Sequence, residues 1–83
     1  MSRPVPDLNP RAPIPLSEQI AAWLRECIAA GDFRPAWDPL PSENQLMQTF
    51  GVSRDTVRRA VAIIVAEGLA YTVPGKGTFV RAR

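Results

Sequence analysis

Two arginines spaced four residues apart, Arg54 and Arg58, are the side chains of this sequence best suited to recognising a partner. If the segment from 53 to 67 is helical, this spacing places both guanidinium groups on one line, one turn apart. Arg presents a planar fork of donors that matches phosphate oxygens and the O6/N7 edge of guanine. The pair therefore indicates contact with DNA, although a charged helical stripe is most often only a solvated face.

Polar side chains next to this pair extend the candidate surface. Ser53 is expected to cap the helix, and Thr56 adds a second short hydroxyl that suits a phosphate oxygen. Asp55 would repel phosphate unless it accepts a hydrogen bond from cytosine N4. The candidate DNA-binding residues of this helix are Ser53, Arg54, Asp55, Thr56, Arg58 and Arg59.

Two helices separated by a short turn are predicted to present this surface. Ser42 and Gln45 form an S-x-x-Q capping box, which predicts a short helix that begins at Ser42 and ends at Gly51. The Ser53 cap follows almost at once, and so short a Gly-containing turn is typical of a helix-turn-helix. The core face of the second of these helices is expected to comprise Val57, Ala60, Val61 and Ile64.

An earlier helix and a connector complete the expected helical part. Apolar residues at three- and four-residue steps predict a helix between Pro15 and Gly31, with Cys27 packed in the core. Its apolar stripe comprises Leu16, Ile20, Trp23, Leu24, Cys27 and Ile28. In the connector, Trp37 is interpreted as a cover over the core, with a DNA or partner contact as the alternative.

The last part of the sequence predicts a small β-hairpin. The segments 70–73 and 78–80 have the composition of strands, and Pro74-Gly75-Lys76-Gly77 between them has that of a tight turn. Gly75 and Gly77 permit a close backbone approach, so Lys76 is placed to enter a minor groove or to meet phosphate. The alternative is a hairpin turn with no further role.

Prolines dominate the start of the chain, at positions 4, 6, 10, 13 and 15. Because each proline fixes its own φ and disfavours helix before it, residues 1–14 are predicted to be a flexible tail that precedes a domain at 15–83. Arg3 and Arg11 could contact a DNA backbone, but a solvated tail is the preferred interpretation.

Composition excludes several classes of protein. The sequence has no His and a single Cys, which excludes a Ser/His/Asp triad, an intrachain disulfide and the usual zinc sites. No enzymatic activity and no cofactor are therefore expected. With neither a membrane-length apolar run nor a signal peptide, the expected location is the cytoplasm, without membrane contact. The net charge of +2 is only mildly basic, so the placement of charge must carry any argument for DNA.

Five short motifs, in order, resemble the GntR type of winged helix domain between Pro15 and Val80: P-L-S-E-Q-I, L-P-S-E-N-Q-L, G-V-S-R-D-T-V-R-R-A, E-G-L and P-G-K-G-T-F-V. The resemblance implies a mainly α fold with a small β-hairpin, namely a winged helix-turn-helix of three helices plus a wing. It further implies transcription regulation, most often repression, by a homodimer on a palindromic operator in double-stranded DNA. A small-molecule effector would act through a second domain, for which this sequence has no counterpart.

The resemblance also implies DNA-contacting residues, which are Arg54, Thr56, Arg58, Gly75 and Gly77, with Ser53 as a cap. Ser42 and Asn44, at the start of the second helix, join the candidates because backbone N–H groups at a helix start favour phosphate. Two departures stand out: Asn44 replaces a usual Arg, and Asp55 replaces a hydroxyl or basic residue. A winged helix that binds another protein is the alternative, and the isolated domain is expected to be monomeric.

Overall fold

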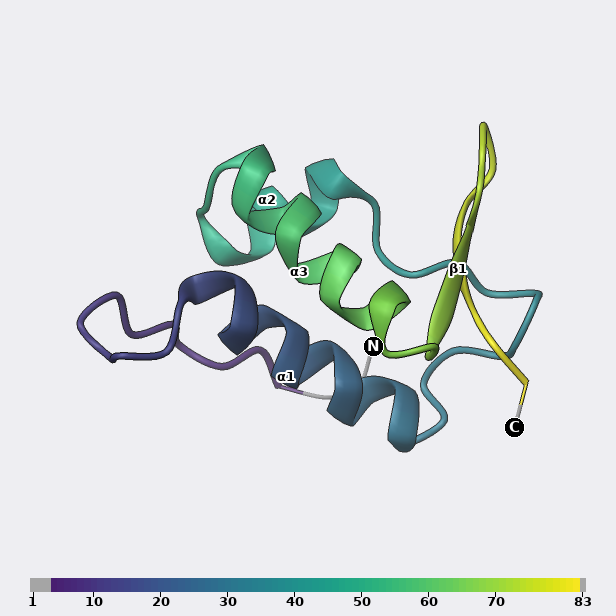
Figure 1. Cartoon of the computed structure of the whole chain (residues 1–83), viewed down its shortest axis with the longest axis horizontal. Helices are drawn as coiled ribbons and strands as arrows, with labels where there is room; N and C mark the ends of the chain where they lie inside the picture. The colour runs from purple at the N-terminus through teal and green to yellow at the C-terminus, as the bar shows by residue number, and fades with distance from the viewer. Residues whose placement is uncertain (1–3, 83) are drawn as a thin grey trace.

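The computed structural model describes residues 4–82, which form three helices and a two-stranded antiparallel hairpin (Figure 1). The elements are α1 (Leu16–Ala29), α2 (Glu43–Phe50), α3 (Arg54–Ala66), β1 (Ala70–Val73) and β2 (Gly77–Val80). Helix α3 packs against both α1 and α2, and the hairpin stands at its C-terminal end as a projecting wing. The predicted fold of three helices plus a wing is confirmed.

Local capping residues set the helix boundaries that present the site. The Ser42 hydroxyl accepts a hydrogen bond from the Gln45 amide at 3.1 Å, and the Gln45 side chain accepts one from the Ser42 amide at 2.8 Å. Gly51 ends α2 with a φ of 65°, a left-handed conformation that glycine adopts at little cost. Ser53 then caps α3 through the Thr56 amide at 3.2 Å. The predicted helix-turn-helix is therefore confirmed at each of its boundaries.

A single apolar cluster joins the helices, the connector and the wing. Trp23 of α1 contacts Phe50 of α2 edge to face, with ring centroids 5.3 Å apart. Cys27 is fully buried, as predicted. Val61 was expected in the core but is only half-buried, because it lies at the border of α3 that faces the wing. The buried cluster comprises Ile20, Ala21, Trp23, Leu24, Cys27, Ile28, Phe33, Leu40, Leu46, Val57, Ala60, Ile64, Ala70 and Val80.

The wing turns tightly because of its proline and glycine. The Lys76 amide donates to the Val73 carbonyl at 3.0 Å, and Gly75 between them has a φ of 76°. Pro before a positive-φ Gly is the composition of a type II turn. The register pairs Thr72 with Thr78, on the same face as the buried Ala70–Val80 pair, so that face points toward the helices. The predicted hairpin is confirmed, with Gly77 as its first returning residue.

The predicted position of Trp37 is wrong, since its side chain is 76% exposed. Arg34 and Asp38 form an ion pair at 3.0 Å that closes a tight turn, and Ala36 within the turn has a φ of 66°. This turn carries Trp37 away from the protein. Phe33 and Leu40, on either side of the turn, are buried in the core instead.

The N-terminal segment, for which a flexible tail is predicted, forms hydrogen bonds with side chains of α1. From Pro4 onward it lies against α1, where Trp23 Nε1 donates to the Pro4 carbonyl at 3.0 Å. The Gln19 side chain accepts from the Asn9 amide and donates to the carbonyls of Asn9 and Ile14, all at 2.9 Å. Arg11 is exposed, and Arg3 lies outside the described residues. The domain boundary at residue 15 stays a prediction.

Residues 4–82 contain neither a membrane-spanning helix nor a cluster of metal ligands. None of the helices there has the length and apolar character needed to cross a membrane. Over the same residues there is no group of three or more His, Cys, Asp or Glu side chains that could hold a metal ion.

Candidate nucleic-acid interface

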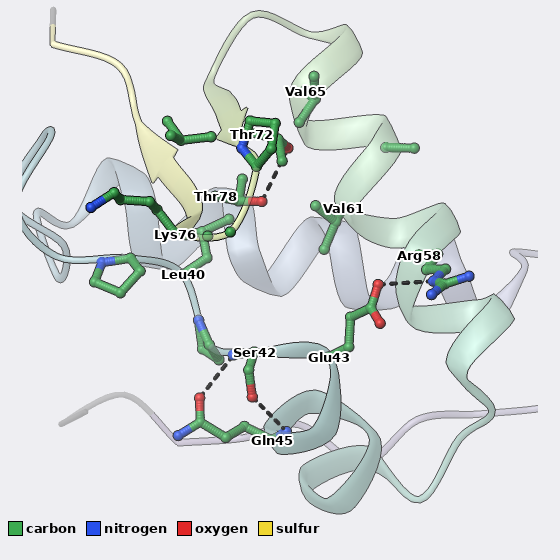
Figure 2. Close-up of a pocket in the computed structure, with 17 residues that line it drawn as sticks. Leu40, Ser42, Glu43, Gln45, Arg58, Val61, Val65, Thr72, Lys76 and Thr78 are labelled. Carbon is green, nitrogen blue, oxygen red and sulfur yellow. Dashed lines mark hydrogen bonds and ion pairs between the residues drawn. The ribbon is translucent and has the colours of Figure 1, made fainter.

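A groove of about 740 Å³ separates α3 from the wing and brings together predicted site residues from three parts of the chain (Figure 2). Ser42 comes from the start of α2, Arg58 from α3, and Gly75, Lys76 and Gly77 from the tip of the wing. All five are exposed. Because the core fixes α3 and the wing to each other, these residues form one continuous surface.

The walls of this groove are mainly uncharged. Val61 and Val65 of α3 form one wall, and Thr72 and Thr78 of the wing form the opposite one (Figure 2). The hydroxyl oxygens of the two threonines lie 3.2 Å apart and bond to each other. Among the residues that line the groove, the cationic side chains are Arg58 of α3 and Lys76 of the wing.

The remaining predicted residues lie outside the groove, at the N-terminal ends of α2 and α3. All of them are exposed except Thr56, which is half-buried. The Ser53 and Thr56 hydroxyls lie 3.1 Å apart and are bonded to each other, while Asp55 and Arg59 form an ion pair at 3.1 Å. Asp55 thus offsets part of the positive charge of this helix end. These residues are Asn44, Ser53, Arg54, Asp55, Thr56 and Arg59.

Glu43 is the residue of this surface that the sequence interpretation missed. Its Oε1 accepts from Arg54 Nη1 at 2.8 Å, and its Oε2 accepts from Arg58 Nε at 2.9 Å (Figure 2 shows the second contact). The neighbouring Asn44 Oδ1 accepts from Arg54 Nη2 at 3.0 Å. One carboxylate therefore bridges the two arginines that the sequence predicted to read DNA.

These contacts have an electrostatic consequence. Hydrogen bonds from Arg58 and then Arg54 lower the pKa of the Glu43 carboxyl below its ordinary value, and the hydrogen bond from Glu43 raises the pKa of Arg58. The charged forms of Glu43 and Arg58 are thus favoured by their contact. The two guanidinium groups nonetheless stay open to solvent, because the side chains of Arg54 and Arg58 are 46% and 64% exposed.

Comparison with known proteins identifies the class to which this fold and surface belong. Residues 16–80 match the family described as bacterial regulatory proteins, gntR family. The chain therefore belongs to the gntR family, as the resemblance implied.

Two relatives illustrate this family. The chain is 45% identical over 74 residues to the HTH-type transcriptional repressor NagR of Bacillus subtilis, and the match covers 89% of the chain and 30% of NagR. It is also 45% identical over 67 residues to the mannosyl-D-glycerate transport/metabolism system repressor MngR of Escherichia coli, covering 81% of the chain and 28% of MngR. The chain thus spans about 30% of the length of such relatives.

Solved structures agree with this assignment. The AraR DBD in complex with operator ORR3 has a TM-score of 0.77 and 41% identity, and the match covers 88% of this chain and 87% of that one. YtrA from Sulfolobus acidocaldarius, a GntR-family transcription factor, has a TM-score of 0.77 and 32% identity, with coverage of 90% and 78%. The winged helix fold is therefore shared with a domain that has been solved on an operator.

Proposed function

We propose that this chain is the module through which a transcription regulator binds double-stranded DNA in a sequence-specific manner. In this proposal, α3 enters the major groove and the wing tip, residues 74–77, contacts the minor groove or the backbone. The observation that carries it is the exposure of the Arg54 and Arg58 guanidinium groups on one side of the first two turns of α3. Residues at the start of a recognition helix are those that meet base edges.

The geometry of Arg58 supports base reading. It donates to Glu43 through Nε, which leaves the Nη1/Nη2 edge of a side chain 64% exposed for a DNA acceptor. That edge is one of the donor forks that can bind guanine O6 and N7 together. Asp55 and Arg59, paired on the exposed side of α3, would lie beside the same bases or phosphates.

Backbone contacts would come from both sides of α3. The N-terminal end of α2 offers phosphate a positive dipole end, the Ser42 hydroxyl and the backbone N–H of Asn44, while the Ser42 N–H is used in the capping box. Lys76 and its flanking glycines would contact the next stretch of the duplex. Ser53 and Thr56 would exchange their mutual hydrogen bond for one to a phosphate oxygen.

The function of a complete protein goes beyond this chain. We propose that it represses transcription from a palindromic operator as a homodimer in the cytoplasm, and that a small-molecule effector acts through a separate domain. The support is that the relatives named as repressors are more than three times as long as the matched region. A second DNA-binding module on one duplex would also raise affinity through effective concentration.

The test is selection of duplexes from a random pool, followed by titrations of Arg54→Ala and Arg58→Ala at two salt concentrations. Each substitution should cost about 1–3 kcal/mol of binding free energy and relax base preference. Arg25→Ala, which removes a cation that pairs with Glu67 between α1 and the end of α3, is the matched control. If both site variants retain affinity and preference, α3 is not the reading helix. Binding that barely depends on salt would favour a protein-interaction module.

A further inference from the structure

The bridge formed by Glu43 crosses between the two helices of the helix-turn-helix. Its carboxylate lies at the first residue of α2, and its partners Arg54 and Arg58 lie 11 and 15 residues further along the chain, on α3. The Glu43 side chain is 39% exposed, so the bridge lies at the surface where a duplex would dock. Its role thus bears on how the arginines meet DNA.

We propose that Glu43 is a specificity-determining positioning residue, which restrains Arg54 and Arg58 so that they bind guanine edges in preference to arbitrary phosphates. The inference rests on the proposed function, since it presumes that α3 reads DNA. It assigns Glu43 no contact with a base.

The first step is conformational. An exposed Arg side chain samples many rotamers, and binding must restrict them at a cost in entropy. A carboxylate bound to Nε of Arg58 restricts that side chain before DNA arrives, with the Nη1/Nη2 edge directed elsewhere. A base acceptor in the right position then meets a donor fork that is already ordered, so binding it costs less entropy. A misplaced acceptor cannot reach the ordered fork and has no such advantage.

The second step is electrostatic. Phosphates are anions, so the Glu43 carboxylate repels them and competes with them for both guanidinium groups. Guanine O6 and N7 are neutral acceptors, which can bind the outer edge of Arg58 while Glu43 stays bound to Nε. Every duplex offers phosphates, whereas guanine edges depend on the sequence. The carboxylate therefore weakens arginine contacts to phosphate more than arginine contacts to guanine.

The two arginines differ in how far they are restrained. Arg54 donates through Nη1 to Glu43 and through Nη2 to Asn44, so both terminal nitrogens are directed at α2. Arg58 has only its Nε engaged with Glu43. Arg58 is thus ready to read a base without rearrangement, while Arg54 must give up part of its contact with α2.

The experiment compares the wild-type chain with Glu43→Gln. One duplex is the sequence that the wild type enriches from a random pool, and the other is a scrambled duplex of the same length and composition. We expect Glu43→Gln to reduce the ratio of the two affinities about tenfold, with part of the change coming from tighter binding to the scrambled duplex.

Glu67→Gln is the matched control. Glu67 has the same side-chain exposure of 39%, pairs with Arg25, and loses the same charge on substitution. Because Glu67 lies at the far end of α3, Glu67→Gln should have the same ratio of affinities for the selected and scrambled duplexes as the wild type. The role of Glu43 would be overturned if the affinity ratio fell equally in both variants, or if it did not fall in Glu43→Gln.

A second variant separates geometry from charge. Glu43→Asp keeps the negative charge but is one methylene too short to bridge both arginines, so it should also lose most of the preference. Full preference in Glu43→Asp would overturn the bridging geometry.

The restraint can also be observed without DNA. The Arg58 Nε proton should exchange slowly with solvent in the wild type and faster in Glu43→Gln, and equal rates would argue against the restraint. A wild type that prefers neither duplex overturns the proposed function and this inference together. A wild type with a clear preference that Glu43→Gln retains overturns only this inference.

Discussion

The Leu40 amide donates a hydrogen bond to the Thr78 carbonyl at 2.8 Å and thereby ties the segment before α2 to the second strand of the wing. A bridge between Pro39 and Phe79 continues this contact along the same strand. The segment that leads into the helix-turn-helix thus also sets the position of the wing. Pro39, Leu40 and Thr78 also line the groove between α3 and the wing.

Gly77 is the wing residue on which this arrangement depends most. Its φ is 133°, and a Cβ added there would lie 3.5 Å from Cβ of Pro39, in ordinary contact, so backbone strain dominates the cost of a substitution. Gly77→Ala should cost about 1–3 kcal/mol of unfolding free energy. Thermal unfolding should then show a melting temperature lower by roughly 4–8 °C per kcal/mol for a domain of this size.

Gly75→Ala provides the comparison for that experiment. Gly75 has a φ of 76°, near the left-handed region that other residues occasionally adopt, and open space surrounds the added Cβ. Its cost should be smaller, about 1 kcal/mol. If Gly75→Ala proves the more destabilising of the two, the wing is not fixed through Gly77 as described.

The two tryptophans should behave as opposites. Trp23 is 4% exposed and its indole N–H is hydrogen-bonded, whereas Trp37 is 76% exposed. Trp37→Phe should change the unfolding free energy by less than about 0.5 kcal/mol, and Trp23→Phe should lower it by about 1–3 kcal/mol. Acrylamide should strongly quench the fluorescence of Trp37 in Trp23→Phe. It should only weakly quench the fluorescence of Trp23 in Trp37→Phe. Strong protection of Trp37 would show that it covers the core after all.

These tryptophans also show which features the sequence could predict. The caps at Ser42 and Ser53 act within three residues, and the glycine that ends α2 acts through its own φ, so local composition was sufficient. The exposure of Trp37 depends on an ion pair that closes a turn around it. Glu43 pairs across 11 and 15 residues, and no periodicity within one helix signals a contact of that kind.

Acid should weaken the fold through the paired carboxylates. Hydrogen bonds from arginines hold the pKa of Glu43 and of Glu67 below the ordinary value of 4.5. The unfolded chain therefore binds more protons than the folded one in this range, so the stabilisation is complete above the unfolded pKa and is lost as the pH falls through the folded pKa. Melting temperatures recorded from about pH 6 down to about pH 3 should fall less in Glu43→Gln and Glu67→Gln than in the wild type. If the melting temperature of the variant carrying both substitutions falls with pH as steeply as that of the wild type, these two carboxylates are not the cause of the acid sensitivity.

Asn44 offers a test of how charge at the start of α2 affects DNA binding. Its Oδ1 accepts from Arg54 Nη2 at 3.0 Å. Asn44→Arg would remove that acceptor and add a guanidinium group that competes with Arg54 for Glu43. If the new side chain meets one phosphate, the slope of log affinity against log salt should steepen by about 0.9, and binding at low salt should tighten.

Asn44→Ala separates the two effects of that substitution, because it removes the acceptor without adding a charge. It should leave the salt slope unchanged and alter binding only through the orientation of Arg54, which is then held by Glu43 alone. Titrations of both variants over a series of salt concentrations measure the difference. Equal slopes in Asn44→Arg and Asn44→Ala would mean that this position does not face phosphate, and that the start of α2 lies away from the duplex.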